Sequence, residues 1–175
     1  MSIQSSKSAK RRLVCVGIVA LCGLPGLHAS TLEAPKERPV LTVSGKIGVT
    51  NSGGNAVFDM AMIEKLPQQT FTTRTPWDNK PVKFSGPLLA DVLAAVKASG
   101  TSIRAVALND YRISIPVEDP RQYRVLMATR MDDQPIPVRT KGPLFIVYPF
   151  DSRPELQSNR FYERSIWQLK AIEIE

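Results

Sequence analysis

The sequence predicts an α+β domain, in which a small mixed β-sheet carries a few short helices. The main observation is a pair of strands at residues 103–108 and 111–115, joined by a turn at Asn109 and Asp110. The second strand alternates apolar and polar side chains, which is typical of a strand with one buried face. Asn and Asp favour tight turns, and Pro116 ends the pairing because it has no amide hydrogen to donate. We expect this hairpin to lie in the middle of the sheet.

Further strands are predicted wherever apolar or β-branched residues are concentrated between turn residues. These stretches are residues 40–43, 46–50, 57–58, 69–75, 82–84, 124–130, 144–148 and 165–173. The stretch at 144–148 is almost entirely apolar, so we expect it to be central. Residues 150–163 show no periodic pattern and are predicted to form a long polar loop, which in a compact domain is often functional or mobile.

Few helices are predicted. Asp59 is placed to cap a short helix at residues 60–66, which Pro67 closes. The clearest helix is expected to start at Ser85-Gly86-Pro87 and to stop at Gly100, because proline suits a first helical turn. Its buried stripe at helical spacing consists of Leu88, Leu89, Val92, Leu93 and Val96. Residues 118–123 are predicted to form a helical turn or loop.

Residues 1–29 have the pattern of a secretory signal peptide. Positive side chains precede an apolar run at residues 13–27, and Ala29 is a small residue at which cleavage is expected. A membrane anchor is the alternative, but the run is shorter than the roughly 20 residues that span a bilayer. We therefore expect a periplasmic or secreted protein with a flexible leader at residues 30–39 and one domain at 40–175. No membrane span is expected after cleavage.

The composition of the expected mature chain excludes several kinds of chemistry. Both cysteines, Cys15 and Cys22, and the only histidine, His28, lie in the predicted signal peptide. The remainder therefore has no Cys or His nucleophile, no Cys/His zinc site and no disulfide. The formal charge of +7 includes four positive side chains of residues 1–29, and the remaining charge of about +3 gives no indication of nucleic-acid binding.

The ordered segments resemble those of a known family. They are LTVSGKI, KLP, FSGPLLADVLAA, ALNDYRISIPVED, LMATRMDDQPIP, KGPLFIVYP and SIWQLKAIEIE. Together, over residues 40–175, this order resembles the oxidoreductase molybdopterin-binding domain of the sulfite oxidase family. The resemblance implies a mixed, barrel-like sheet fold with a concave site at the end of the sheet.

The resemblance also implies a ligand that this chain lacks. In that family a cysteine thiolate ahead of the GxPL helix binds molybdenum, and sulfur is the soft ligand for this role. The matching residues 71–78 carry Thr73 and Thr75 instead, and residues 165–169 lack the lysine that precedes the family's final tryptophan. We therefore expect a degenerate member without a metal site, catalytic residues or cofactor, although the resemblance leaves molybdopterin open.

Ten residues are candidates for ligand binding: Arg74, Thr75, Trp77, Asn109, Asp110, Tyr111, Arg130, Arg139, Lys141 and Arg164. A cluster of Arg74, Arg130 and Arg139 would suit an anionic ligand, because guanidinium groups bind phosphate or carboxylate through two hydrogen bonds. The alternative is that these arginines are solvated or paired with acidic residues. Trp77, in a loop between two prolines, is either a platform for a ligand or a packing residue.

These observations favour an exported, non-catalytic binding module that recognises an anionic small molecule or a periplasmic protein. The alternative is a periplasmic molybdopterin-dependent oxidoreductase that holds its cofactor without a cysteine. A hydrolase with paired carboxylates is disfavoured, because Glu118-Asp119 and Asp132-Asp133 are adjacent, and neighbours on a strand face opposite ways. Calcium binding at Asn109-Asp110 or Asp132-Asp133 is disfavoured because neither stretch has the EF-hand spacing.

Overall fold

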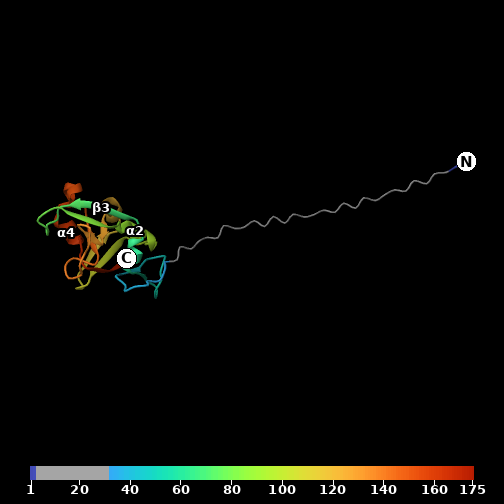
Figure 1. The fold of residues 1–175 in the computed structure, drawn as a ribbon, viewed down its shortest axis with the longest axis horizontal. Helices are drawn as coiled ribbons and strands as arrows, with labels where there is room; N and C mark the ends of the chain where they lie inside the picture. Colours follow the sequence, from blue (N-terminus) through green and yellow to red (C-terminus); the bar gives the residue numbers. More distant parts are fainter. Residues whose placement is uncertain (3–31) are drawn as a thin grey trace.

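The structure is a computed structural model that describes residues 1–2 and 32–175 (Figure 1). The predicted signal peptide, with Cys15, Cys22 and His28, therefore lies outside the described residues except for its first two positions. Within the described part of the chain, no helix is long and apolar enough to cross a membrane.

Three β-sheets and four short α-helices form the domain, which confirms the predicted α+β class. The five-stranded sheet has the order β2 (Ala56–Phe58), β1 (Leu41–Gly45), β11 (Leu169–Ile174), β5 (Ser102–Ala107) and β6 (Arg112–Pro116). The four-stranded sheet has the order β3 (Gln68–Thr73), β4 (Val82–Pro87), β8 (Arg130–Met131) and β9 (Gln134–Pro135). The third sheet pairs β7 (Leu126–Ala128) with β10 (Phe145–Val147). Only the pairing of β1 with β11 is parallel among the described strands, so the sheet is mixed as expected.

The position of the hairpin differs from the prediction. Its pairing is confirmed, with Ile103 opposite Ile115 and Ala105 opposite Ile113. However, β6 is an edge strand, and the centre of the sheet is β11, which contacts β1 on one side and β5 on the other. The expectation of a central hairpin was wrong because local alternation fixes the register of a strand pair but not its neighbours. The predicted strand at residues 46–50 is also absent from the structure.

The helices are α1 (Met60–Glu64), α2 (Leu89–Ala95), α3 (Asp119–Gln122) and α4 (Asn159–Arg164). In Figure 1 the label of α4 lies at the left of the folded domain and that of α2 toward its right. The expected start of α2 at residues 85–87 was wrong, because β4 continues to Pro87. Gly86 is needed there, since a Cβ atom would lie 2.3 Å from the carbonyl oxygen of Met127. The predicted loop at 150–163 instead contains the 3₁₀ helices η1 (Phe150–Ser152) and η2 (Pro154–Leu156) and most of α4.

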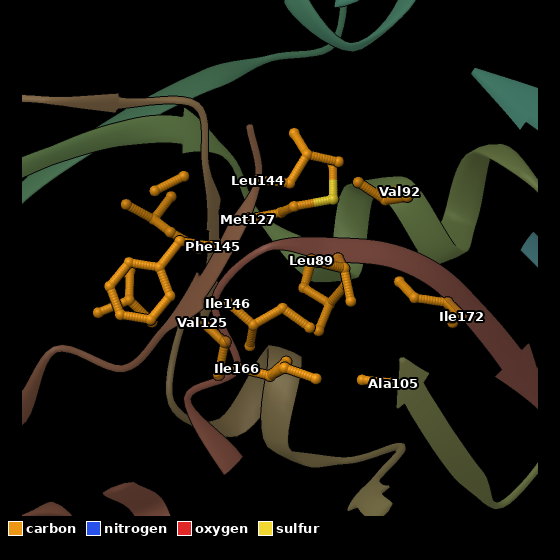
Figure 2. Packing of buried hydrophobic residues seen from close by; sticks show 14 of the residues in the cluster. Leu89, Val92, Ala105, Val125, Met127, Leu144, Phe145, Ile146, Ile166 and Ile172 are labelled. Carbon is orange, nitrogen blue, oxygen red and sulfur yellow. The ribbon is translucent and has the colours of Figure 1, made fainter. Parts of the chain in front are cut away.

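The core forms where α2 packs against strands of different sheets. Leu89 and Val92 of α2 point into the same cluster as Met127, Ile146 and Ile172, as Figure 2 shows. All five side chains are fully buried. Burying a large aliphatic side chain contributes about 1.5–3 kcal/mol to the free energy of unfolding, so these five side chains stabilise the domain.

A buried carboxylate fixes the beginning of the domain. Asp59 caps α1, as predicted, by accepting a hydrogen bond from the backbone N–H of Met62 at 2.8 Å. Its other oxygen accepts bonds from the N–H groups of Lys36 (2.7 Å) and Glu37 (3.0 Å). These bonds, above all that of Met62, lower the pKa of Asp59. Part of the expected leader is thus bound to α1.

Candidate functional site

An aromatic pocket of about 360 Å³ opens between the β5–β6 turn, α4 and the loop after β3. We call it the Trp77 pocket. Its lining residues are Trp77, Ala107, Asn109, Tyr111, Tyr162, Glu163, Ser165, Ile166 and Trp167. A volume of this size is within the range of small-molecule sites. Three sequence candidates, Trp77, Asn109 and Tyr111, therefore meet in one place.

Trp77 both packs and lines the pocket. Its ring lies edge-on to those of Trp167 (5.3 Å between centroids), Tyr162 (6.2 Å) and two phenylalanines, Phe145 and Phe150 (both 6.1 Å). Such tilted contacts are the favoured geometry of aromatic pairs. Because several neighbours hold the half-buried ring, it lines the pocket in a fixed orientation.

The β5–β6 turn places its three polar residues on different sides. The Asn109 side-chain oxygen accepts a hydrogen bond from the N–H of Tyr111 at 3.1 Å, and Asp110 adopts a left-handed backbone with φ of 65°. Asn109 and Tyr111 line the Trp77 pocket, whereas the Asp110 carboxylate accepts a bond from Lys170 at 2.7 Å. That bond lowers the pKa of Asp110. Asp110 is thus not part of the pocket lining.

A polar cluster lies beside Trp77. The Asp78 carboxylate accepts hydrogen bonds from the Lys141 ammonium at 2.7 and 2.8 Å and from the Thr75 hydroxyl at 2.7 Å. Thr75 in turn accepts a bond from the N–H of Trp77 at 3.2 Å. The Lys141 nitrogen is 5.9 Å from the centroid of the Trp167 ring. The candidates Thr75 and Lys141 therefore position the loop that carries Trp77.

The predicted arginine cluster has no common partner in the structure. Arg74 pairs with Asp151 of η1 (3.8 Å), and Arg130 pairs with Glu64 of α1 (3.4 Å). Arg139 is exposed in the loop after β9, and none of the three lines the Trp77 pocket. Two of the arginines are thus paired with acidic residues and the third is exposed to solvent, as in the alternative to a ligand-binding cluster.

Arg164 belongs to a separate buried network. Its guanidinium donates to the Asp119 carboxylate at 2.8 Å, and the Tyr148 hydroxyl donates to the same oxygen at 2.7 Å. Burial, together with the bond to Asp119, raises the pKa of Tyr148 well above its ordinary value. The network joins α3, α4 and the end of β10, and it contributes no residue to the pocket.

Comparison with known protein families gives one match. The model of a family described as "Oxidoreductase molybdopterin binding domain" matches residues 49–150. The chain belongs to this family. A comparison of the sequence of this chain with curated protein sequences found no match.

The fold is similar to that of the sulfane dehydrogenase SoxCD from Paracoccus pantotrophus. The TM-score is 0.59 at 14% sequence identity, and the match covers 77% of this chain. It covers 37% of the SoxCD chain, so the present chain spans well under half the length of that protein. The predicted sulfite oxidase-like fold is thereby confirmed.

The donor groups of this molybdopterin-binding-type domain do not fit the metal that the family implies. Residues 32–175 contain no cysteine. The Thr73 hydroxyl, 1% exposed, donates to the carbonyl oxygen of Arg74 (3.2 Å) and accepts from the N–H of Asp151 (2.9 Å). Thr75 is likewise engaged with Asp78 and Trp77. No group of three or more His, Cys, Asp or Glu side chains within the described residues is arranged to hold a metal ion.

Sequence reasoning missed six lining residues: Ala107, Tyr162, Glu163, Ser165, Ile166 and Trp167. Residues 162 and 163 fell in the stretch predicted to be a loop, and 167 in one predicted to be a strand. A signal was available in the density of aromatic residues at positions 161, 162 and 167. Aromatic residues so close together in a polar segment indicate a shared cluster.

Proposed function

We propose that this member of the molybdopterin-binding domain family is an exported binding module, which recognises its ligand or a partner protein at the Trp77 pocket without a molybdenum centre. The observation that carries the proposal is the state of Thr73 and Thr75. These residues occupy the segment in which the resemblance places the metal-binding cysteine, and both hydroxyls already donate and accept hydrogen bonds within the protein.

The pocket supports binding because its walls are held in place by packing. Trp77, Tyr162 and Trp167 contact one another or shared aromatic neighbours, so the cavity does not depend on a cofactor to maintain its shape. Rigid aromatic walls with a few polar groups are typical of small-molecule sites.

Metal analysis of the exported protein tests the proposal. The full chain is produced in cells that make molybdopterin, and a known molybdenum enzyme made in the same cells serves as the control for cofactor supply. We expect no stoichiometric molybdenum by elemental analysis and no pterin fluorescence after oxidation. Stoichiometric amounts of both would contradict the proposal. N-terminal sequencing of the exported protein tests cleavage, and we expect the mature chain to begin at Ser30.

The second candidate is a periplasmic molybdopterin-dependent oxidoreductase, and family membership is the observation that favours it. Under this alternative a threonine oxygen replaces the cysteine sulfur as the ligand. Thr73→Ala and Thr75→Ala would then release the cofactor, whereas equal molybdenum content in both variants and the parent would exclude these hydroxyls as ligands.

A further inference from the structure

The lining of the Trp77 pocket is electron-rich. Four aromatic side chains contribute to it, namely Trp77, Tyr111, Tyr162 and Trp167. The face of an aromatic ring carries a negative partial charge, and it attracts a cation that lies within about 6 Å of the ring centroid. A cation that stacks on the faces of these rings would therefore be favoured before any ionised group is considered.

The ionised group in the lining adds to this preference. Among the described residues that line the pocket, Glu163 is the charged one and none is a lysine or arginine. Glu163 forms no ion pair with any residue from 32 to 175. Arg164, which follows it in α4, is bound to Asp119. An anionic ligand would therefore face an uncompensated carboxylate, whereas a cation would pair with it.

Lys141, which lies beside one wall of the pocket, does not cancel this preference. Lys141 lies 5.9 Å from the Trp167 centroid, which is a cation–π distance. Its charge is balanced by Asp78, which contacts the ammonium through both carboxylate oxygens. The pair is neutral as a unit, so Glu163 sets the sign of the charge in the pocket.

We propose that the Trp77 pocket binds a small organic cation with a methylated ammonium group, such as a trimethylammonium head group. This inference rests on the proposed function and specifies the ligand class for the same site. Methyl groups would contact the apolar side chains of Ala107 and Ile166, while the diffuse positive charge faces the rings. Quaternary ammonium is also less strongly hydrated than a primary ammonium, and aromatic cages recognise it for this reason.

Tryptophan fluorescence gives a direct readout, because the two tryptophans of the chain, Trp77 and Trp167, both line the pocket. We would titrate the full exported protein with choline and, in parallel, with 3,3-dimethylbutan-1-ol, its uncharged isostere. We expect saturable quenching by choline and about tenfold weaker binding of the isostere, because the isostere loses the contacts of several rings with a cation. Phosphatidylcholine vesicles in a sedimentation arm distinguish a lipid head group from a free cation.

Glu163→Gln tests the charge without changing the size of the side chain. We expect choline to bind about two- to fivefold more weakly, the effect of one solvent-accessible charge pair. Glu37→Gln, an exposed glutamate outside the pocket, is the matched control and should bind like the parent. Equal affinity for choline and its isostere, or no saturable quenching by choline, would overturn the inference.

These outcomes are separate from the test of the proposed function. If the protein contains no molybdenum and does not bind choline, the binding-module proposal stands but the proposed ligand class is wrong. A protein with stoichiometric molybdenum would refute the binding module, and the choline titration would still report independently on the pocket.

Discussion

Two neighbouring regions of the molecule share α4 but use it differently. Tyr162 and Glu163 line the open Trp77 pocket, whereas Arg164 is bound to Asp119 in a buried network. In the network each of the three side chains is hydrogen-bonded to another, and the Tyr148 ring is fully buried. In the pocket Glu163 is exposed, and its carboxylate forms no ion pair with any of residues 32–175. Consecutive residues of one short helix thus contribute separately to the proposed binding pocket and to a network that supports the fold.

The largest effect is expected from removing the carboxylate of the network. Asp119→Ala leaves the Tyr148 hydroxyl without its acceptor and Arg164 without its ion-pair partner. Breaking a buried ion pair on one side costs roughly 3–5 kcal/mol, and Arg164 is partly exposed, so we expect a loss of about 3 kcal/mol. Urea denaturation followed by circular dichroism measures the free energy of unfolding. A loss below about 1 kcal/mol would show that the network is not a main support of the fold.

A smaller effect is expected from Tyr148→Phe, which removes one buried hydrogen bond at a cost of about 1 kcal/mol. The raised pKa of Tyr148 also predicts a pH dependence. The folded protein keeps the phenolic proton above pH 10, where the unfolded chain releases it, so stability falls as pH rises above the ordinary value of 10.0. Urea titrations at several alkaline pH values should show a weaker decline in the variant. Tyr111→Phe, at an exposed position, is the control that should retain the parent's decline.

The smallest effect on stability is expected from Glu163→Gln. The side chain is exposed and holds no partner among the described residues, so the free energy of unfolding should change by less than about 0.5 kcal/mol. Arg164→Gln, one position along α4, should by contrast lose the bond to Asp119 and unfold at lower urea. If thermal unfolding showed equal losses for the two variants, the functional division of α4 would be refuted.

Local patterns in the sequence predicted local structure. The alternation at residues 111–115 correctly predicted a strand paired with the one before it, although residue 107 rather than 108 lies opposite Tyr111, and Asp59 was correctly expected to cap α1. The start of α2 was missed because proline is compatible with both a first helical turn and the end of a strand. Residues 85–87 form the end of β4, since Gly86 lets this strand approach the backbone of Met127 closely.

The site was harder to predict than the fold because it combines segments that are distant in sequence. Trp77 was singled out from its loop, but its neighbours come from α4 and from the residues before β11. The arginines were misleading for a related reason, because a charged side chain pairs with whichever acidic group the fold brings near. For Arg74 that group is Asp151, which is 77 residues away in sequence.

The central place of β11 has a consequence for biosynthesis. This strand lies between β1 and β5, and it follows both of them in the chain by more than 60 residues. Until β11 has been synthesised, the β1–β2 and β5–β6 hairpins have no strand to join them. We therefore expect the nascent chain to complete this sheet only after β11 has left the exit tunnel, and to assemble it slowly because the contacts are so distant in sequence.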